Sequence, residues 1–261
     1  MNVHRIPSAL RFGLPNALTL ANLLCGCIGI VGALNGGYAW AWWMILVAGI
    51  LDFGDGAVAR WLKAPSAMGK ELDSLADLVS FGVLPACLAL VHARSLLPSY
   101  GASPWPTDAT GPRYWPMDPW PNHPEGWWLL AFAAIPLASA WRLARFNLEE
   151  GSSRFFSGLP TPAHAILWMS FLGSIPVWPT ELWTGLKAWH LSGAALLGSA
   201  LLVSRWPLLS LKFEAGATRL NYARWFLLGL GLLAILVGGL AGLFLVMLFY
   251  FPYSFLIARF L

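Results

Sequence analysis

The chain has 261 residues, of which 58% are hydrophobic and only 11% are charged. An ordinary soluble domain is about 25% charged, so this composition argues against a soluble globular protein and indicates one folded in lipid. The net charge of +4 is no evidence for a nucleic-acid partner, and we expect none.

Runs of about 20 apolar residues are long enough to cross a bilayer as helices. Eight such runs follow one another, near residues 15–35, 38–60, 71–97, 127–148, 160–178, 188–204, 222–238 and 240–257. Only Gly238 and Gly239 separate the last two runs, which could therefore form a re-entrant pair. The pattern predicts an all-α, polytopic bundle of transmembrane helices.

Lysine and arginine are divided unevenly between the two sides of such a bundle. If the N-terminus lies in the cytoplasm, thirteen basic residues fall on the cytoplasmic side and three, Arg94, Arg113 and Lys187, fall outside. Cytoplasmic loops of membrane proteins carry an excess of Lys and Arg. We therefore expect a multi-pass protein of the cell (inner) membrane with both termini in the cytoplasm.

Four aspartates interrupt the apolar sequence within residues 51–77, "LDFGDGAVARWLKAPSAMGKELDSLAD". Asp52 and Asp55 are three residues apart and Asp73 and Asp77 are four apart, so each pair shares one face of a helix. A short link lets the two helices lie antiparallel with their acidic faces opposed. Roughly 21 Å of apolar helix precedes the first aspartate, which places the carboxylates near headgroup depth and not at the bilayer centre.

Carboxylates buried together repel one another, and each costs about 2.5–3.5 kcal/mol at the centre of a transmembrane helix. A cluster that offers only oxygen ligands suits hard divalent cations such as Mg²⁺ or Mn²⁺. Two such ions would neutralise the aspartates and clamp a phosphate group during a displacement. The alternatives are an ion-pair network with Arg60, Lys63 and Lys70, or a site for cation or proton transport.

The same stretch resembles the signature of the CDP-alcohol phosphatidyltransferase family. That signature reads Asp-x-x-Asp-Gly-x-x-Ala-Arg, eight residues, then Gly-x-x-x-Asp-x-x-x-Asp. Every specified position is filled, by Asp52, Asp55, Gly56, Ala59, Arg60, Gly69, Asp73 and Asp77. Within the family the chain most resembles the integral-membrane phosphatidylserine synthases, through "LPNALTLANLLCG" (14–26), "ELDSLADLVSFGVLPA" (71–86), "RLARFN" (142–147) and "FSGLPTPA" (156–163).

The resemblance implies a six-helix core that forms a homodimer, with its site open to the cytoplasm and the inner leaflet. In this chain residues 1–213 would form that transmembrane domain. It would include an external loop at 98–126, which is too rich in proline for a helix or a central strand. Residues 214–261 would add two C-terminal transmembrane helices.

The resemblance also implies a reaction, in which the phosphatidyl group passes from CDP-diacylglycerol to the hydroxyl of L-serine and CMP is released. Two divalent cations, Mg²⁺ or Mn²⁺, would be held by Asp52, Asp55, Asp73 and Asp77, and Asp77 would also act as base for the acceptor hydroxyl. The CDP group would be accommodated by Asn16, Thr19, Gly56, Ala59, Arg60 and Gly69.

Serine must be recognised through its carboxylate and its ammonium group. Arg142 and Arg145 are candidates for the carboxylate, because a guanidinium binds such groups in bidentate fashion. Asn147 could add hydrogen bonds, whereas anchoring to anionic lipid is the alternative role for the arginines. We expect His164, just inside the fifth helix, to be a packed residue and not a catalytic one.

Other acceptors remain open within the same family, namely glycerol 3-phosphate, an inositol phosphate or choline. A phosphorylated acceptor would call for a denser basic pocket than one arginine pair. An archaeal-type lipid donor is equally compatible with the sequence, because no motif reads the lipid tails. From a different class, a transporter would typically show inverted repeats and a midplane site, and the sequence indicates neither.

Overall fold

The computed structural model describes residues 8–63, 66–96, 124–148, 155–177, 185–209 and 218–260. The elements of the first half are α1 (Ser8–Leu34), α2 (Tyr38–Trp61), α3 (Ala67–Asp77), the π-helix η2 (Leu78–Val83), α4 (Leu84–Ser95), the 3-10 helix η5 (Pro124–Ala133) and α5 (Ala134–Leu148). Those of the second half are β1 (Phe155–Ser157), α6 (Thr161–Ser174), the 3-10 turn η6 (Ile175–Val177), α8 (Ala188–Val203), β2 (Pro207–Leu209) and α9 (Thr218–Phe260). The predicted loop at 98–126 falls almost entirely outside the described residues.

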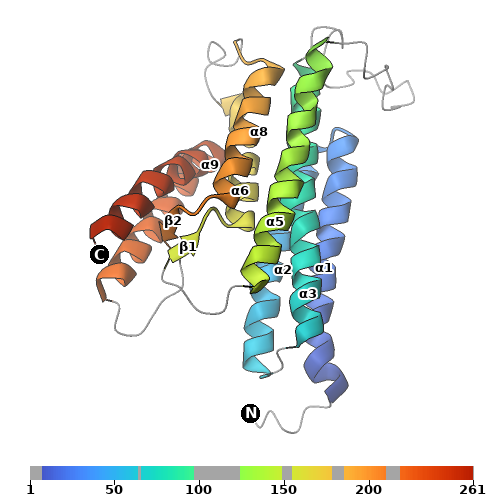
Figure 1. Cartoon of the computed structure of the whole chain (residues 1–261), viewed down its shortest axis with the longest axis vertical. Helices are drawn as coiled ribbons and strands as arrows, with labels where there is room; N and C mark the ends of the chain where they lie inside the picture. The colour runs from blue at the N-terminus through green and yellow to red at the C-terminus, as the bar shows by residue number, and fades with distance from the viewer. Residues whose placement is uncertain are drawn as a thin grey trace.

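The all-α, polytopic prediction is confirmed. Within the described residues, five stretches are long and apolar enough to cross a membrane: Gly13–Leu34, Tyr38–Trp61, Ala67–Arg94, Trp127–Leu148 and Leu220–Arg259. The third joins α3, η2 and α4 end to end, and the fourth joins η5 and α5. The apolar runs predicted near 160–178 and 188–204 form the shorter helices α6 and α8. Figure 1 shows α1, α2, α3 and α5 standing side by side in one bundle.

The core of the bundle lies between α2, α4, α6 and α8. Its largest fully buried side chains include Ile45, Leu88, Met169 and Leu191. Large apolar side chains also cover the outside, for example Ile50, which is 71% exposed. Such an exterior is expected where the solvent is the hydrocarbon of a bilayer, since lipid tails are as apolar as leucine.

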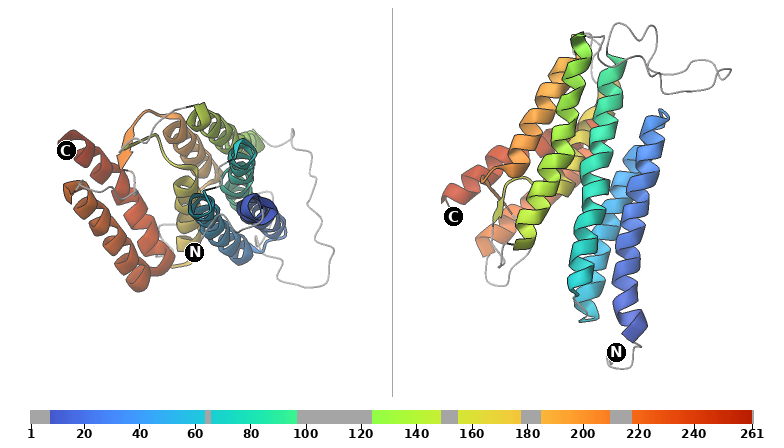
Figure 2. Two further views of the ribbon diagram at one scale, coloured as in Figure 1. Left: turned by 90° about the horizontal axis from the view of Figure 1, so that it is seen from below. Right: turned by 45° about the vertical axis from the view of Figure 1, so that its right-hand side comes forward.

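The last two predicted helices form a hairpin within α9. The backbone leaves helical geometry at Gly239, whose φ of 54° and ψ of −132° favour glycine. Beyond this point the chain returns along itself, and Leu220 and Leu227 in the first arm pack in one cluster with Tyr253 and Ile257 in the second. Figure 2 shows the two arms lying next to each other, tilted against the bundle.

A small feature that the sequence did not predict joins the two halves of the chain. β1 pairs antiparallel with β2, with Phe155 opposite Leu209. Directly after β1, the N–H of Gly158 donates to the carbonyl of Trp206 (2.9 Å) and the N–H of Leu159 donates to the carbonyl of Leu201 (3.1 Å). The segment between α5 and α6 is thereby tied to the end of α8.

Candidate active site

The four aspartates lie on two neighbouring helices, as their spacing predicts. Asp52 and Asp55 belong to α2, and Asp73 and Asp77 belong to α3. Carboxylate oxygens of Asp52, Asp55 and Asp73 lie within 4.8 Å of one another. Asp77, one turn further along α3, is only 8% exposed and its side chain meets Asn22 of α1.

The three converging carboxylates fit a hard divalent cation. They offer oxygen ligands only, which Mg²⁺ and Mn²⁺ prefer. Asp55 is 6% exposed, and Oδ1 of Asp73 is buried without a hydrogen-bond partner among the described residues. A buried carboxylate oxygen with no donor is costly unless a cation binds it. The described residues can therefore hold a metal ion at this place.

Two of the basic side chains beside the site, Lys70 and Arg60, have contacts other than the aspartates. The ammonium group of Lys70 donates to the backbone carbonyl of Asn147 (2.6 Å). Arg60 is exposed, and its guanidinium reaches back over Gly56, 3.4 Å from where a Cβ on that glycine would lie. These positions leave the centre of the carboxylate cluster open to a cation.

Helix α1 holds the aspartates from the side. The hydroxyl of Thr19 donates to Oδ2 of Asp55 (2.6 Å), and the side-chain amide of Asn22 donates to Oδ1 of Asp77 (3.3 Å). Thr19 and Asn22 are 3% and 0% exposed, so neither bond competes with bulk water. Hydrogen bonds to charged groups in such surroundings are stronger than neutral ones, and they orient the carboxylate.

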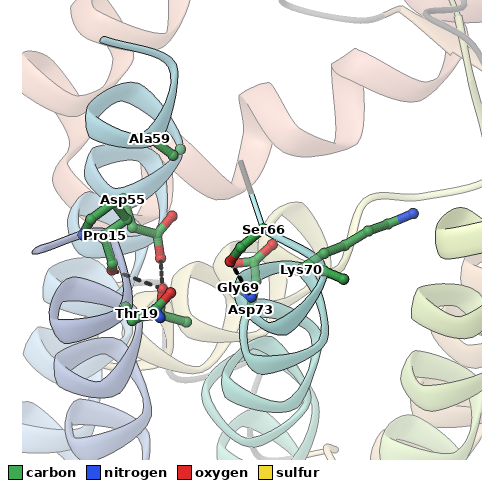
Figure 3. Close-up of a pocket in the computed structure, with 11 residues that line it drawn as sticks. Pro15, Thr19, Asp55, Ala59, Ser66, Gly69, Lys70 and Asp73 are labelled. Atoms are coloured by element: carbon green, nitrogen blue, oxygen red, sulfur yellow. Dashed lines mark hydrogen bonds between the residues drawn. The ribbon is translucent and has the colours of Figure 1, made fainter. Parts of the chain in front are cut away.

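A cavity of about 530 Å³ opens beside the cluster. Its lining includes five of the six residues predicted to accommodate CDP, namely Asn16, Thr19, Gly56, Ala59 and Gly69, together with Pro15, Asp55, Ser66, Ala67, Lys70 and Asp73. Figure 3 shows Asp55 and Thr19 on one side of it and Ser66, Gly69 and Asp73 on the other. The sixth residue, Arg60, adjoins this lining through Gly56.

Glycine keeps one wall of the cavity open. A Cβ on Gly69 would lie 2.9 Å from Oγ of Ser66 and 3.2 Å from Oδ1 of Asn16, so a larger residue would crowd both. Ser66 is the N-cap of α3, and its hydroxyl accepts a hydrogen bond from the N–H of Gly69 (2.9 Å). The first turn of α3 is thereby fixed at the edge of the cavity.

The three residues predicted to bind serine lie on α5, and none of them lines the cavity. Nη1 of Arg142 donates to Oγ1 of Thr161 (3.2 Å), at the start of α6. Nη2 of Arg145 donates to Oγ of Ser157 (2.7 Å). The amide of Asn147 donates to Oγ of Ser74 on α3 (2.8 Å). The group is therefore tied to α3 and α6, and its role in serine binding stays a prediction.

His164 is a packed residue, as expected. It is 0% exposed, and its Nε2 accepts a hydrogen bond from the indole N–H of Trp168 (3.1 Å). Gly198 of α8 leaves room for it, since a Cβ there would lie 2.7 Å from the same nitrogen.

Asn22 was not among the predicted site residues, although the sequence carries a signal for it. Asn16, Thr19 and Asn22 follow one another at intervals of three in an otherwise apolar helix. Polar side chains within a membrane-spanning helix require partners, so a stripe of this kind indicates a face turned to a polar site. What the stripe could not indicate was which aspartate each residue would meet.

The chain is similar to proteins whose names describe the synthesis of serine-containing lipids. The chain is 34% identical over 217 residues to a CDP-diacylglycerol–serine O-phosphatidyltransferase of Mycobacterium tuberculosis, covering 80% of this chain and 65% of that protein. It is 33% identical over 149 residues to the protein of the same name from Bacillus subtilis, covering 57% of this chain and 69% of the relative. An archaetidylserine synthase of Methanothermobacter thermautotrophicus is 32% identical over 173 residues, or 66% of this chain and 61% of the relative.

This chain thus spans slightly less than two thirds of the mycobacterial relative. Residues 12–206 match the sequence profile of CDP-alcohol phosphatidyltransferases, a range that includes all four aspartates, the cavity and the arginines of α5. Because every position of the aspartate spacing is filled and the profile matches most of this chain, the chain belongs to the CDP-alcohol phosphatidyltransferase family.

Proposed function

We propose that this protein is a phosphatidylserine synthase, which transfers the phosphatidyl group of CDP-diacylglycerol to L-serine and releases CMP. The observation that carries the proposal is the convergence of Asp52, Asp55 and Asp73 within 4.8 Å beside a cavity of about 530 Å³. A carboxylate cluster of this kind suits a metal-bound diphosphate, and the adjoining space suits the rest of a nucleotide. The names of the relatives support serine as the acceptor.

In the proposed reaction the serine hydroxyl oxygen forms a bond to the phosphorus that carries the diacylglycerol. The bond from that phosphorus to the oxygen of CMP breaks, and CMP leaves with the electron pair. The hydroxyl proton passes to Asp77, because a neutral hydroxyl is a poor nucleophile and a nearby carboxylate lowers the barrier. Bound as a pair, Mg²⁺ or Mn²⁺ would stabilise the charge that builds up on the diphosphate oxygens.

We assign the remaining roles to three groups of residues in this chain. Asp52, Asp55, Asp73 and Asp77 hold the cations, and Asp77 is also the base. Asn16, Thr19, Gly56, Ala59, Arg60 and Gly69 accommodate the CDP group. Arg142, Arg145 and Asn147 receive the serine, and the hydrogen bond from Asn147 to Ser74 supports this by placing α5 directly against α3.

A second candidate differs in the lipid and not in the acceptor. The archaetidylserine synthase of Methanothermobacter is 32% identical to this chain, which favours serine but leaves the lipid backbone of the donor open. We place CDP-diacylglycerol first because the bacterial relatives named above carry it in their names.

We further propose that both termini and the site face the cytoplasm at the cell (inner) membrane, and that the protein is a homodimer. The start of α1, the end of α2 and the end of α5 lie toward one end of the bundle (Figure 1). Arg60, Lys63 and Lys70 belong to that end, and the excess of basic residues on cytoplasmic sides supports this orientation.

Residues 1–213 would form the catalytic domain and 214–261 an additional hairpin, and the match over 12–206 supports this division. The homodimer follows from the resemblance to the family.

The test is CMP release by the purified protein with CDP-diacylglycerol, Mn²⁺ or Mg²⁺, and a panel of L-serine, glycerol 3-phosphate, inositol phosphate and choline. We expect CMP and phosphatidylserine with serine alone, and no turnover after removal of the metal with EDTA. CMP release with glycerol 3-phosphate but not with serine would overturn the choice of acceptor. Repeating the assay with a CDP-activated archaeal ether lipid decides between the two donors.

A further inference from the structure

We infer that Asn22 is a positioning residue for Asp77, whose carboxylate it holds by one oxygen so that the other faces the reacting groups. The inference rests on the proposed function, in which Asp77 takes the proton of the acceptor hydroxyl. It assigns a role to a residue of α1 that belongs neither to the aspartate signature nor to the lining of the cavity.

The contact joins two buried groups from different helices. Asn22 is 0% exposed and Asp77 is 8% exposed, and Nδ2 of Asn22 lies 3.3 Å from Oδ1 of Asp77. Only the nitrogen end of the amide can donate to a carboxylate, so the bond also fixes how the amide lies. Away from water such a bond keeps its strength and restricts the rotation of the carboxylate.

The backbone of Asn22 is itself held in place. The hydroxyl of Ser80 donates to the Asn22 carbonyl (2.9 Å), and Ser80 is 0% exposed. At Gly26, one turn further along α1, a Cβ would lie 2.5 Å from Oγ and 3.0 Å from Cα of Ser80. Ser80 belongs to η2, the π-helix that begins directly after Asp77, so α1 is bonded to this helix at Asp77 and again three residues later. π-helical turns of this kind are frequent at functional sites.

The contact of Asn22 is distinct from the three carboxylates that converge in the structure. The oxygens that converge within 4.8 Å belong to Asp52, Asp55 and Asp73, and Asp77 is not among them. Thr19 donates to one of those three, Asp55, whereas the side-chain amide of Asn22 donates to Asp77. Loss of the amide should therefore slow the proton transfer and leave the binding of CDP nearly unchanged.

The first experiment compares Asn22→Leu, which keeps the approximate shape without the donor, with the wild type in detergent. We expect kcat to fall about 10- to 100-fold, with KM for CDP-diacylglycerol and Kd for CDP in Mn²⁺ within about threefold, as for a residue that acts through a general base. Asn35→Leu is the matched control, in the turn directly after the same helix. Asn35 is exposed just beyond the far end of α1, its side chain donates to the carbonyl of Val31, and its replacement should give wild-type kinetics. An unchanged kcat in Asn22→Leu, or an equal loss of CDP affinity, would overturn the inference.

The second experiment does not need an acceptor. Thermal unfolding of Asn22→Ala, Asp77→Ala and the double variant, without added metal, measures the coupling between the two side chains. We expect the changes in Tm of the single variants not to add in the double variant, and strict additivity would contradict the contact. The alanine variants also serve if Asn22→Leu does not fold. Coupling without turnover on any acceptor would refute the proposed function and leave the contact between Asn22 and Asp77 standing.

Discussion

The aspartates of the site have different neighbours. Asp55 accepts a hydrogen bond from Thr19, Asp77 accepts one from Asn22, and Oδ1 of Asp73 has no hydrogen-bond partner in the described part of the chain. The first two carboxylates are therefore oriented by the protein, whereas the third keeps an oxygen for a cation.

Replacing Asp77 by asparagine removes the proposed base while keeping its size. We expect Asp77→Asn to bind CDP in Mn²⁺ with near wild-type affinity and to lose about 10²-fold or more in kcat, because general base catalysis contributes 10²–10⁴-fold. Calorimetric titration with CDP and an assay of CMP release measure the two quantities. Full activity in this variant would remove Asp77 as the base.

Arg142 tests the proposed serine pocket. We expect Arg142→Ala to raise KM for serine roughly 10- to 100-fold, which corresponds to a lost charged hydrogen bond of about 1.5–3 kcal/mol. KM for CDP-diacylglycerol should change far less, and initial rates at varied concentrations of each substrate separate the two effects. Equal increases in both constants would indicate that Arg142 only supports α6 through its bond to Thr161.

At the scale of the elements, a short connection between α5 and α6 holds the helices together. β1, β2 and Gly158 fasten the segment after α5 to the end of α8, and Leu159 N–H satisfies the carbonyl of Leu201. Gly158 has a φ of 80°, and a Cβ there would lie 2.6 Å from the carbonyl oxygen of Ser204 and 2.8 Å from that of Leu202. Both the backbone conformation and the close approach require glycine at this position.

Gly158→Ala should therefore lower the stability of the protein. A non-glycine residue in this conformation costs about 1–3 kcal/mol, and the approach to two carbonyl groups adds to it. Thermal unfolding in detergent gives the change in Tm. Gly193→Ala is the control, because Gly193 is exposed within α8 and a Cβ there meets nothing within 4 Å. A Gly158→Ala variant as stable as this control would refute the steric argument.

Considered as a whole, the protein is a bundle whose two ends differ. One end carries the aspartates with Arg60, Lys63 and Lys70 around them, and the exterior between the ends is covered with large apolar side chains. The α9 hairpin packs Tyr250 and Phe251 against the cluster formed by Ala138, Leu159 and Leu202. It therefore supports α5, α6 and α8, and contributes no residue to the lining of the cavity.

The proposed orientation predicts which positions an impermeant reagent can reach. In a background with Cys25, Cys27 and Cys87 replaced by alanine, we introduce Lys63→Cys and Lys187→Cys, both at exposed positions. A membrane-impermeant maleimide should label the Lys187→Cys variant in intact cells and the Lys63→Cys variant only after permeabilisation. The opposite pattern would place the aspartate site outside the cytoplasm.

Local features of the sequence predicted most of the helices and the two acidic faces. Helix formation depends on residues close together in the chain, so runs of apolar residues predict helices. This held for α6 and α8 too, although both helices are shorter than the predicted runs. The hairpin of α9 was predicted as a pair of helices because Gly238 and Gly239 interrupt the apolar run. The pairing of β1 with β2 was not predicted, since strands of three residues carry almost no periodic signal.

The sequence by itself determined that this chain spans a membrane and carries four carboxylates on two adjacent helix faces, because both properties follow from composition and short-range spacing. Only the tertiary structure decided that Asp52, Asp55 and Asp73 converge while Asp77 turns to Asn22, and that Arg142, Arg145 and Asn147 stand outside the cavity. The physical reason is that these contacts join α1, α3, α5 and α6 across tens of residues. Their geometry depends on how the helices pack, which spacing along one helix does not specify.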